Sequence, residues 1–245
     1  GGGGGRGGGG GPPPPPPPPP APGTRAPRTR AVVFDLDGTL VDSVADVAAA
    51  LAVVLREAGI HPLSEDEVRG LMGHGAPGLL RGALRLRRCG PGEAEWMTRR
   101  FLDRYAAAPA VRSTAYPGAV AAVAALAAAG IPVGICTNKA AWTGRAVLRA
   151  LGFAPHVGAL VGGDSGHGMK PDPAPLLACI AELGAAPEDT VYLGDHHVDV
   201  TTARAAGVRV LAVPFGYGDV AMLEPDGILA DYAALPDMLG LVEAG

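Results

Sequence analysis

Five short apolar runs, each leading into or followed by polar residues or glycine, constrain the fold of this chain more than any other feature. They alternate with alanine- and leucine-rich stretches whose apolar residues recur at intervals of three or four. Buried strands that alternate with helices are typical of βαβ units and a parallel sheet. The runs are 31–35 (AVVFD), 131–138 (IPVGICTN), 157–164 (VGALVGGD), 191–195 (VYLGD) and 208–213 (VRVLAV), and the helical stretches are 118–129, 140–151, 173–183 and 199–206.

The segment between the first and second apolar runs predicts helices and no strand. Residues 42–59 predict a first helix, which Asp42 or Ser43 caps and Gly59 ends. The stretch 62–112 has helical periods throughout. We therefore expect an α/β fold with a Rossmann-like parallel sheet core and a helical cap inserted after the first strand. The expected parts are a core of residues 30–44 and 113–245 and a helical cap of residues 45–112.

The first 29 residues differ in composition from the rest of the chain. Residues 1–11 are glycine except for Arg6, and residues 12–20 are consecutive prolines. Such a tract has almost no apolar surface to bury, so it cannot offset the entropy that ordering would cost. We expect residues 1–29 to form a disordered Gly/Pro tail.

Charge and cysteine content narrow the function classes. The formal net charge is −4, and residues 1–30 contain four arginines and no acid, so the remaining chain carries −8. An acidic body argues against nucleic-acid binding.

The cysteines and the apolar runs bear on the location of the protein. Cys89, Cys136 and Cys179 form no CxxC motif, which favours free thiols in a reducing compartment. No apolar run approaches the roughly 18–20 residues of a membrane span, so we expect a cytoplasmic protein. The sequence does not indicate its oligomeric state.

Acidic side chains follow two of the expected strands. Asp35 ends the first run, and Asp37 lies two residues on, before Gly38, which permits a tight turn. Asp195 ends another run, and Asp199 lies about one helical turn later. In parallel sheets the ligands bind at the carboxyl ends of the strands. Carboxylates this close repel unless a cation intervenes, and oxygen ligands without cysteine favour Mg²⁺.

Two further residues supply donors for phosphate. Lys170 in GMKPDP is a compact positive charge in a loop stiffened by prolines. Thr137 ends the run IPVGICT, where its hydroxyl and nearby backbone N–H groups can bind phosphate oxygens. Asp35 is then a candidate nucleophile that forms an aspartyl-phosphate, and Asp37 a candidate general acid and base.

These motifs, in this order, closely resemble those of the haloacid dehalogenase superfamily of phosphatases. DLDGT, CTN, the lysine of MKPDP and GDHHVD match its four motifs in turn, and the resemblance covers about residues 30–245. The resemblance implies that Asp35 is the nucleophile and Asp37 the general acid and base, and that phosphate is bound by Thr137, Asn138 and Lys170. It also implies that Mg²⁺ is bound by Asp35, the Asp37 carbonyl and Asp195. Asp199 would support the ion without binding it directly.

Within the superfamily the chain is similar to the phosphoglycolate phosphatases, through VFDLDGTLVDS, LMGHG, KPDP and PFGYG. We therefore expect a small phosphorylated metabolite as substrate, 2-phosphoglycolate first. The core motifs recognise only the phosphoryl group, so the cap must select the leaving group. His74, beside Gly75 in the LMGHG loop, would pair with the substrate carboxylate, with Arg81 or Arg85 as alternatives.

Two residues depart from the pattern of many relatives. His196 and His197 follow Asp195 where those relatives have Ser-Lys or Ser-Arg. The sequence GDH also occurs in related sugar-acid phosphate phosphatases, so a sugar or sugar-acid phosphate is an alternative substrate. The sequence does not define what His196 and His197 do.

Other function classes stay open. A phosphomutase shares the aspartyl-phosphate but returns the phosphate to a sugar, and phosphate release without a bisphosphate activator would separate the two. A dehalogenase lacks the second aspartate, and Asp37 is present here. A non-catalytic binding protein on this fold is a further alternative, which any turnover that depends on Asp35 would exclude.

Overall fold

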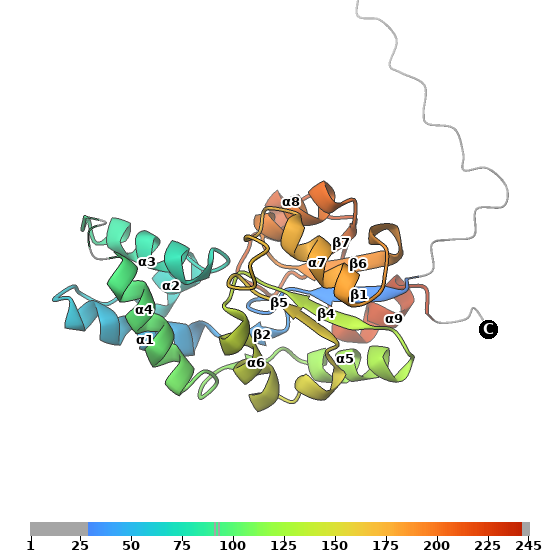
Figure 1. The fold of residues 1–245 in the computed structure, drawn as a ribbon, viewed down its shortest axis with the longest axis horizontal. Helices are drawn as coiled ribbons and strands as arrows, with labels where there is room; N and C mark the ends of the chain where they lie inside the picture. The colour runs from blue at the N-terminus through green and yellow to red at the C-terminus, as the bar shows by residue number, and fades with distance from the viewer. Residues whose placement is uncertain (1–28, 91, 93, 242–245) are drawn as a thin grey trace, which may run out of the picture.

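A six-stranded parallel sheet forms the centre of the molecule in the computed structural model, which describes residues 29–90, 92 and 94–241 (Figure 1). The expectation of an α/β fold is thereby confirmed, and each of the five apolar runs contains a strand. The strands lie in the order β5 (Ala159–Val161), β4 (Val133–Cys136), β1 (Ala31–Phe34), β6 (Thr190–Gly194), β7 (Arg209–Ala212) and β8 (Gly227–Ile228). All neighbouring strands pair in parallel.

Helices cover both faces of this sheet, and each face has its own apolar core. The side chains of β1 alternate, so that Val32 and Phe34 belong to one core and Val33 to the other. One face carries α7 (Ala174–Glu182) and α8 (His197–Ala206), and the other carries α5 (Ala119–Ala128), α6 (Ala141–Ala150) and α9 (Leu235–Met238) (Figure 1). A sheet buried on both faces explains why its strands read as continuous apolar runs.

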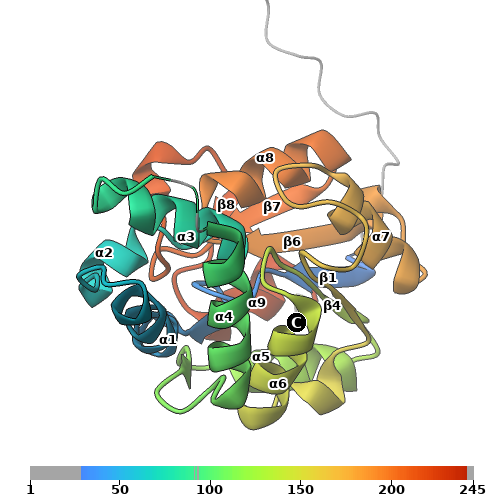
Figure 2. The same ribbon diagram turned by 60° about the vertical axis from the view of Figure 1, so that its left-hand side comes forward.

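Four more helices lie together beside the sheet (Figure 1). They come between two short strands, β2 (Val41–Asp42) and β3 (Thr114–Ala115), which form an antiparallel pair. The helices are α1 (Val44–Glu57), α2 (Glu65–Arg69), α3 (Gly75–Leu86) and α4 (Ala94–Ala107). Helix α1 contacts α2 and α4, α3 contacts α4, and α4 also contacts α6 of the sheet layer (Figure 2). The division at residues 45 and 112 into core and cap stays a prediction.

Of the two residues expected to cap α1, Asp42 bonds the start of the helix and Ser43 does not. Ser43 precedes the helix but makes no helix-capping hydrogen bond with its side chain. Its hydroxyl donates instead to Asp37 Oδ1 at 2.6 Å. Asp42 Oδ1 accepts from the Val44 N–H at 3.3 Å, so Asp42 takes part in the helix start and Ser43 belongs to the site described below.

Three other expectations concern the chain as a whole. Apart from Thr29, the expected tail of residues 1–29 lies outside the described residues. Cys89, Cys136 and Cys179 are all free thiols, as predicted. In the part of the chain that the structure describes, no helix has both the length and the apolar character needed to cross a membrane.

Candidate active site

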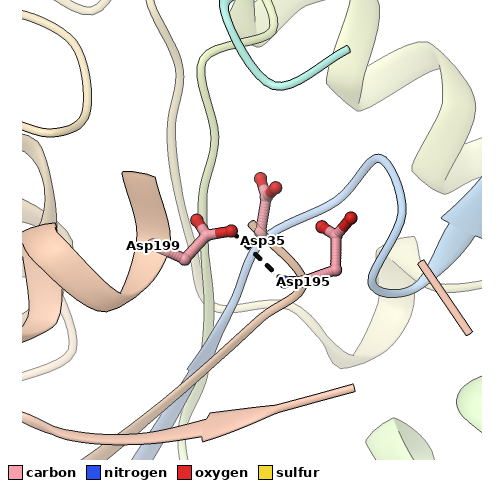
Figure 3. Close-up of side chains that lie close together, drawn as sticks. All are labelled: Asp35, Asp195 and Asp199. Atoms are coloured by element: carbon pink, nitrogen blue, oxygen red, sulfur yellow. Dashed lines mark hydrogen bonds between the residues drawn. The ribbon is translucent and has the colours of Figure 1, made fainter. Parts of the chain in front are cut away.

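Three buried carboxylates meet at the carboxyl ends of β1 and β6 (Figure 3). Asp35 directly follows β1, Asp195 directly follows β6, and Asp199 lies in the first turn of α8. One oxygen from each lies within 4.8 Å of the others. The parallel pairing of β1 with β6 explains their convergence, since both strands end at the same edge of the sheet.

The electrostatics of this cluster favour a bound cation. Burial raises the pKa of Asp35, against the opposing effect of Lys170, and burial together with the charges of Asp199 and Asp35 raises the pKa of Asp195. Asp35 Oδ1 is buried, and none of the described residues donates a hydrogen bond of good geometry to it, although Lys170 Nζ lies 3.0 Å away. A group of carboxylate oxygens without sulfur fits Mg²⁺, so these residues suit the expected ion.

Asp195 is held by the turn after β1 and by the loop after β7. Thr39 Oγ1 donates to Asp195 Oδ1 at 3.2 Å, and the N–H groups of Tyr217 and Gly218 donate to Oδ2 at 2.7 and 3.3 Å. A Cβ atom on Gly38 or Gly216 would collide with this carboxylate. The sequence predictions gave the loop at 216–218 no role. The glycines on both sides of Tyr217 are the sequence feature that could have indicated a close backbone approach there.

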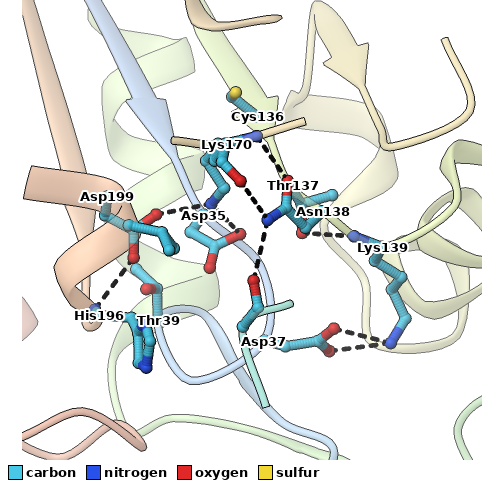
Figure 4. A network of polar contacts seen from close by, with 12 residues as sticks. Asp35, Asp37, Thr39, Cys136, Thr137, Asn138, Lys139, Lys170, His196 and Asp199 are labelled. Carbon is cyan, nitrogen blue, oxygen red and sulfur yellow. Dashed lines mark hydrogen bonds and ion pairs between the residues drawn. The ribbon is translucent and has the colours of Figure 1, made fainter. Parts of the chain in front are cut away.

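Lys170 lies at the centre of a buried polar network (Figure 4). Its Nζ donates to Asp199 Oδ1 at 2.6 Å and to Tyr192 Oη at 2.8 Å, besides the ion pair with Asp35. Burial opposes the charge of Lys170, but the two carboxylates outweigh it and raise its pKa above the usual value. The sequence predictions did not include Tyr192. The one feature that could have indicated it is a hydroxyl group within the apolar run VYLGD.

The carboxylate of Asp199 is occupied by protein donors on both oxygens. Oδ1 accepts from Lys170 and from Tyr192 Oη at 2.8 Å, and Oδ2 accepts from the N–H groups of Asp195 and His196 at 3.2 and 3.0 Å. Asp199 therefore fixes Lys170 and the turn between β6 and α8. The expected role of Asp199 outside the direct ligands of the ion stays a prediction.

Asp37 is held by two side chains from different segments. Ser43 Oγ donates to its Oδ1, and Lys139 Nζ donates to Oδ1 at 3.0 Å and to Oδ2 at 2.8 Å. Lys139 Nζ also lies 4.4 Å from the centre of the Tyr105 ring on α4. Asp35 and Asp37 line a small cavity of about 50 Å³ between the strand ends and helices α3 and α4. The sequence predictions assigned Lys139 no role, although it directly follows the CTN motif.

The two predicted phosphate-binding residues after β4 line the same cavity. Thr137 Oγ1 accepts from the Lys139 N–H at 3.3 Å. The Asn138 side-chain amide donates to the carbonyls of Gly73 and Lys170 at 2.9 and 3.0 Å, and it accepts from the Lys170 N–H at 2.8 Å. Asn138 thus ties the loop before α3 to the Lys170 loop, and a phosphate contact from it would use its backbone N–H.

His74 and Gly75 lie at the start of α3 and face different parts of the site. Gly75 has φ +63° and lines the small cavity, where a Cβ would lie 2.6 Å from the Asn138 carbonyl oxygen. His74 lines a second cavity of about 370 Å³ with Arg81, Arg85, Asn138 and Lys170. The structure therefore places His74 in the second cavity, outside the cavity that Asp35 and Asp37 line.

His74 also contacts the two histidines that follow Asp195. Its ring centre lies 5.4 Å from that of His196 and 5.9 Å from that of His197. Burial is the main cause that lowers the pKa of His74, and burial lowers the pKa of His196 to about 4. His74 and His196 therefore favour the neutral form at the contact between α3 and the β6–α8 turn.

Comparisons with known proteins find relatives that match most of this chain. A family model described as haloacid dehalogenase-like hydrolase matches residues 32–213. A phosphoglycolate phosphatase of Rhodospirillum rubrum is 40% identical over 224 residues, with 88% of this chain and 93% of that protein covered. One of Cereibacter sphaeroides is 41% identical over 213 residues, with 85% and 96% covered. A crystal structure titled a predicted phosphoglycolate phosphatase, from Haemophilus somnus, superposes with a TM-score of 0.81 at 28% identity and covers 86% of this chain and 98% of its own.

Proposed function

This chain belongs to the haloacid dehalogenase-like hydrolase family and is a phosphatase, and from that premise we propose that it hydrolyses 2-phosphoglycolate to glycolate and phosphate. The proposal includes an aspartyl-phosphate intermediate and dependence on Mg²⁺. The observation that carries it is the position of Asp35, which lies at the end of β1 with Lys170 Nζ 3.0 Å from one carboxylate oxygen and Asp195 beside it. A carboxylate next to a fixed cation and a metal-binding group is placed to attack phosphorus.

In the first step a carboxylate oxygen of Asp35 attacks phosphorus. The bond between phosphorus and the ester oxygen breaks, and that oxygen takes a proton from Asp37 as glycolate leaves. Lys170 and Thr137 bind the phosphoryl oxygens and compensate their charge. Ser43 and Lys139 keep the Asp37 carboxylate in one orientation during the transfer.

In the second step water attacks phosphorus. Asp37 takes a proton from that water, and the bond between phosphorus and Asp35 breaks, which returns both aspartates to their starting state. Asp35, the Asp37 carbonyl and Asp195 would hold Mg²⁺, which supplies positive charge against the phosphoryl oxygens. Asp199 acts through Lys170 and the β6–α8 turn, since its oxygens already have protein donors.

The size of the cavity supports a small leaving group. A cavity of about 50 Å³ holds only a few water molecules, at roughly 10–15 Å³ each. A two-carbon leaving group suits such a space better than a sugar does. The names of the curated relatives at 40% and 41% identity support the same substrate.

We also propose that residues 45–112 act as a cap that selects the leaving group. Helices α3 and α4 supply several of the residues that line the cavity opposite the strand ends, among them Leu79, Phe101 and Tyr105. Closing these helices over the site would exclude bulk water from the phosphoryl group.

The test is phosphate release from a panel of esters by wild-type protein and by Asp35→Asn. Wild type should give its highest kcat/KM with 2-phosphoglycolate and should need no bisphosphate activator. Asp35→Asn keeps the shape of the side chain and removes its nucleophilic charge, so activity should fall to background with an unchanged Tm. A folded Asp35→Asn protein that retains a substantial share of activity would exclude Asp35 as the nucleophile. If a sugar-acid phosphate outcompetes phosphoglycolate, the proposed substrate is wrong but the phosphatase function stands.

A further inference from the structure

We infer that Tyr105 binds the carboxylate of the leaving group and thereby selects acidic esters over neutral ones, an inference that rests on the proposed phosphatase function. Tyr105 lies near the end of α4 and is only 2% exposed. Its ring lines the cavity that Asp35 and Asp37 also line. The residue therefore faces the space that the leaving group would occupy beside the ester oxygen.

The hydroxyl of Tyr105 is fully buried and makes no hydrogen bond of good geometry with the described residues, although Lys139 acts on it and lowers its pKa against the effect of burial. Buried hydroxyl groups are nearly always paired, because an unpaired one loses its hydrogen bonds to water. Burial raises the pKa of Tyr105, so the hydroxyl keeps its proton and is available as a donor. An acceptor on a bound ligand would satisfy it.

One positive charge lies beside the Tyr105 ring, and Asp37 shares it. Among the described residues that line the cavity, Lys139 is the one basic side chain, and its Nζ lies 4.4 Å from the Tyr105 ring centre. Much of the remaining wall on the α3 and α4 side is apolar, including Leu79 and Phe101. A carboxylate in such a space needs the few donors and the positive charge that are present.

The ring of Tyr105 is fixed independently of its hydroxyl. It stacks on Phe101 with ring centres 5.8 Å apart and planes at 17°, and Lys139 lies over its face. Tyr105→Phe would preserve both contacts and remove only the donor. We therefore expect this variant to fold with an unchanged Tm.

The experiment compares 2-phosphoglycolate with ethyl phosphate, in which a methyl group replaces the carboxylate and the leaving group is still an alkoxide. Tyr105→Phe should lower kcat/KM for phosphoglycolate by about tenfold or more, mainly through KM, because a hydrogen bond to a charged group is lost. With ethyl phosphate it should stay within about twofold of wild type. Tyr116→Phe is the matched control. It removes another buried hydroxyl that has no hydrogen-bond partner among the described residues, and Tyr116 does not line the cavity.

The outcomes distinguish a failure of the proposed role of Tyr105 from a failure of the proposed substrate. Equal losses with both substrates, or no loss with either, would overturn the role of Tyr105 while wild type still prefers phosphoglycolate. A selective loss in His74→Ala together with none in Tyr105→Phe would place the carboxylate in the second cavity and also overturn it. If wild type itself does not prefer phosphoglycolate over ethyl phosphate, the proposed substrate falls and the inference falls with it.

Discussion

The orientation of Asp37 depends on a single buried cation. Lys139 donates to both of its carboxylate oxygens, at 3.0 and 2.8 Å, and Ser43 donates to one of them at 2.6 Å. The Lys139 side chain is only 8% exposed, so solvent screens this ion pair little. A general acid must meet the ester oxygen within hydrogen-bond reach, and Lys139 fixes the direction from which Asp37 can do so.

Lys139→Met should therefore slow the hydrolysis of those esters whose leaving oxygen must be protonated. We expect kcat/KM for ethyl phosphate to fall by at least about tenfold, whereas p-nitrophenyl phosphate, whose leaving group departs without a proton, should lose much less. Neither ester carries a carboxylate, so the comparison isolates Asp37 from leaving-group recognition. Lys139→Arg should recover part of the loss. Equal losses with both esters would show that Lys139 acts on binding or folding instead.

The residues that the sequence identified and those that it missed differ in how their partners are placed. Asp35 and Asp195 could be predicted because each directly follows an apolar run, and strand ends converge in a parallel sheet. Tyr105 and Lys139 are revealed only by their contacts, since Lys139 pairs with Asp37 across 102 positions of the chain. Tyr105 has no local pattern that separates it from a core tyrosine, and for Lys139 the position after the CTN motif does not by itself reveal the partner.

At the scale of the element, the turn after β1 must fit closely under Asp195. Gly38 has φ +87°, and a Cβ there would lie 2.8 Å from Asp195 Oδ1 and closer still to Oδ2. The turn therefore needs glycine both for its backbone conformation and for the approach of the carboxylate. The same approach allows Thr39 to donate to Asp195.

Gly38→Ala should weaken Mg²⁺ binding and lower kcat by at least about tenfold, because the added methyl group displaces Asp195. Gly59→Ala is the control. It has a similar φ of +70°, yet its Cβ would meet nothing within 4 Å. That variant should lose about 1–2 kcal/mol of unfolding free energy from the left-handed conformation alone, with kcat unchanged. If both variants lose stability but neither loses activity, the contact with Asp195 is unimportant.

The helices and strands could be predicted where they are long enough to show a periodic pattern of apolar residues. The runs at 31–35 and 191–195 became β1 and β6, and the helical stretch at 140–151 became α6. The strands β2, β3 and β8 have two residues each, too few to show the alternation that identifies a strand. Of the two residues expected to cap α1, Asp42 bonds the start of the helix, whereas the Ser43 hydroxyl donates a hydrogen bond to the Asp37 carboxylate.

At the scale of the whole molecule, the site joins segments that are distant in the sequence. Asn138 after β4 bonds the Gly73 carbonyl before α3, and Asp195 after β6 bonds the loop that follows β7. The three carboxylates of Asp35, Asp195 and Asp199 lie at the centre of these connections. A cation that binds only the folded arrangement must therefore stabilise the entire fold, since binding to the native state alone shifts the unfolding equilibrium.

Mg²⁺ should raise the Tm of the wild-type protein, and EDTA should abolish activity until Mg²⁺ is restored. At 100 times its Kd the ion adds about 2.7 kcal/mol to the free energy of unfolding, which for a chain of this size corresponds to roughly 5–10 °C in Tm. Asp195→Asn should lose most of this shift, because it removes a charged ligand. Asp164→Asn is the matched control, since Asp164 follows β5 but bonds the Ala141 N–H at 2.6 Å and lies outside the cluster. The measurement is a thermal scan at increasing Mg²⁺ with each variant. A shift of equal size in Asp195→Asn and wild type would place the ion elsewhere, and full turnover after exhaustive chelation would remove Mg²⁺ from the mechanism.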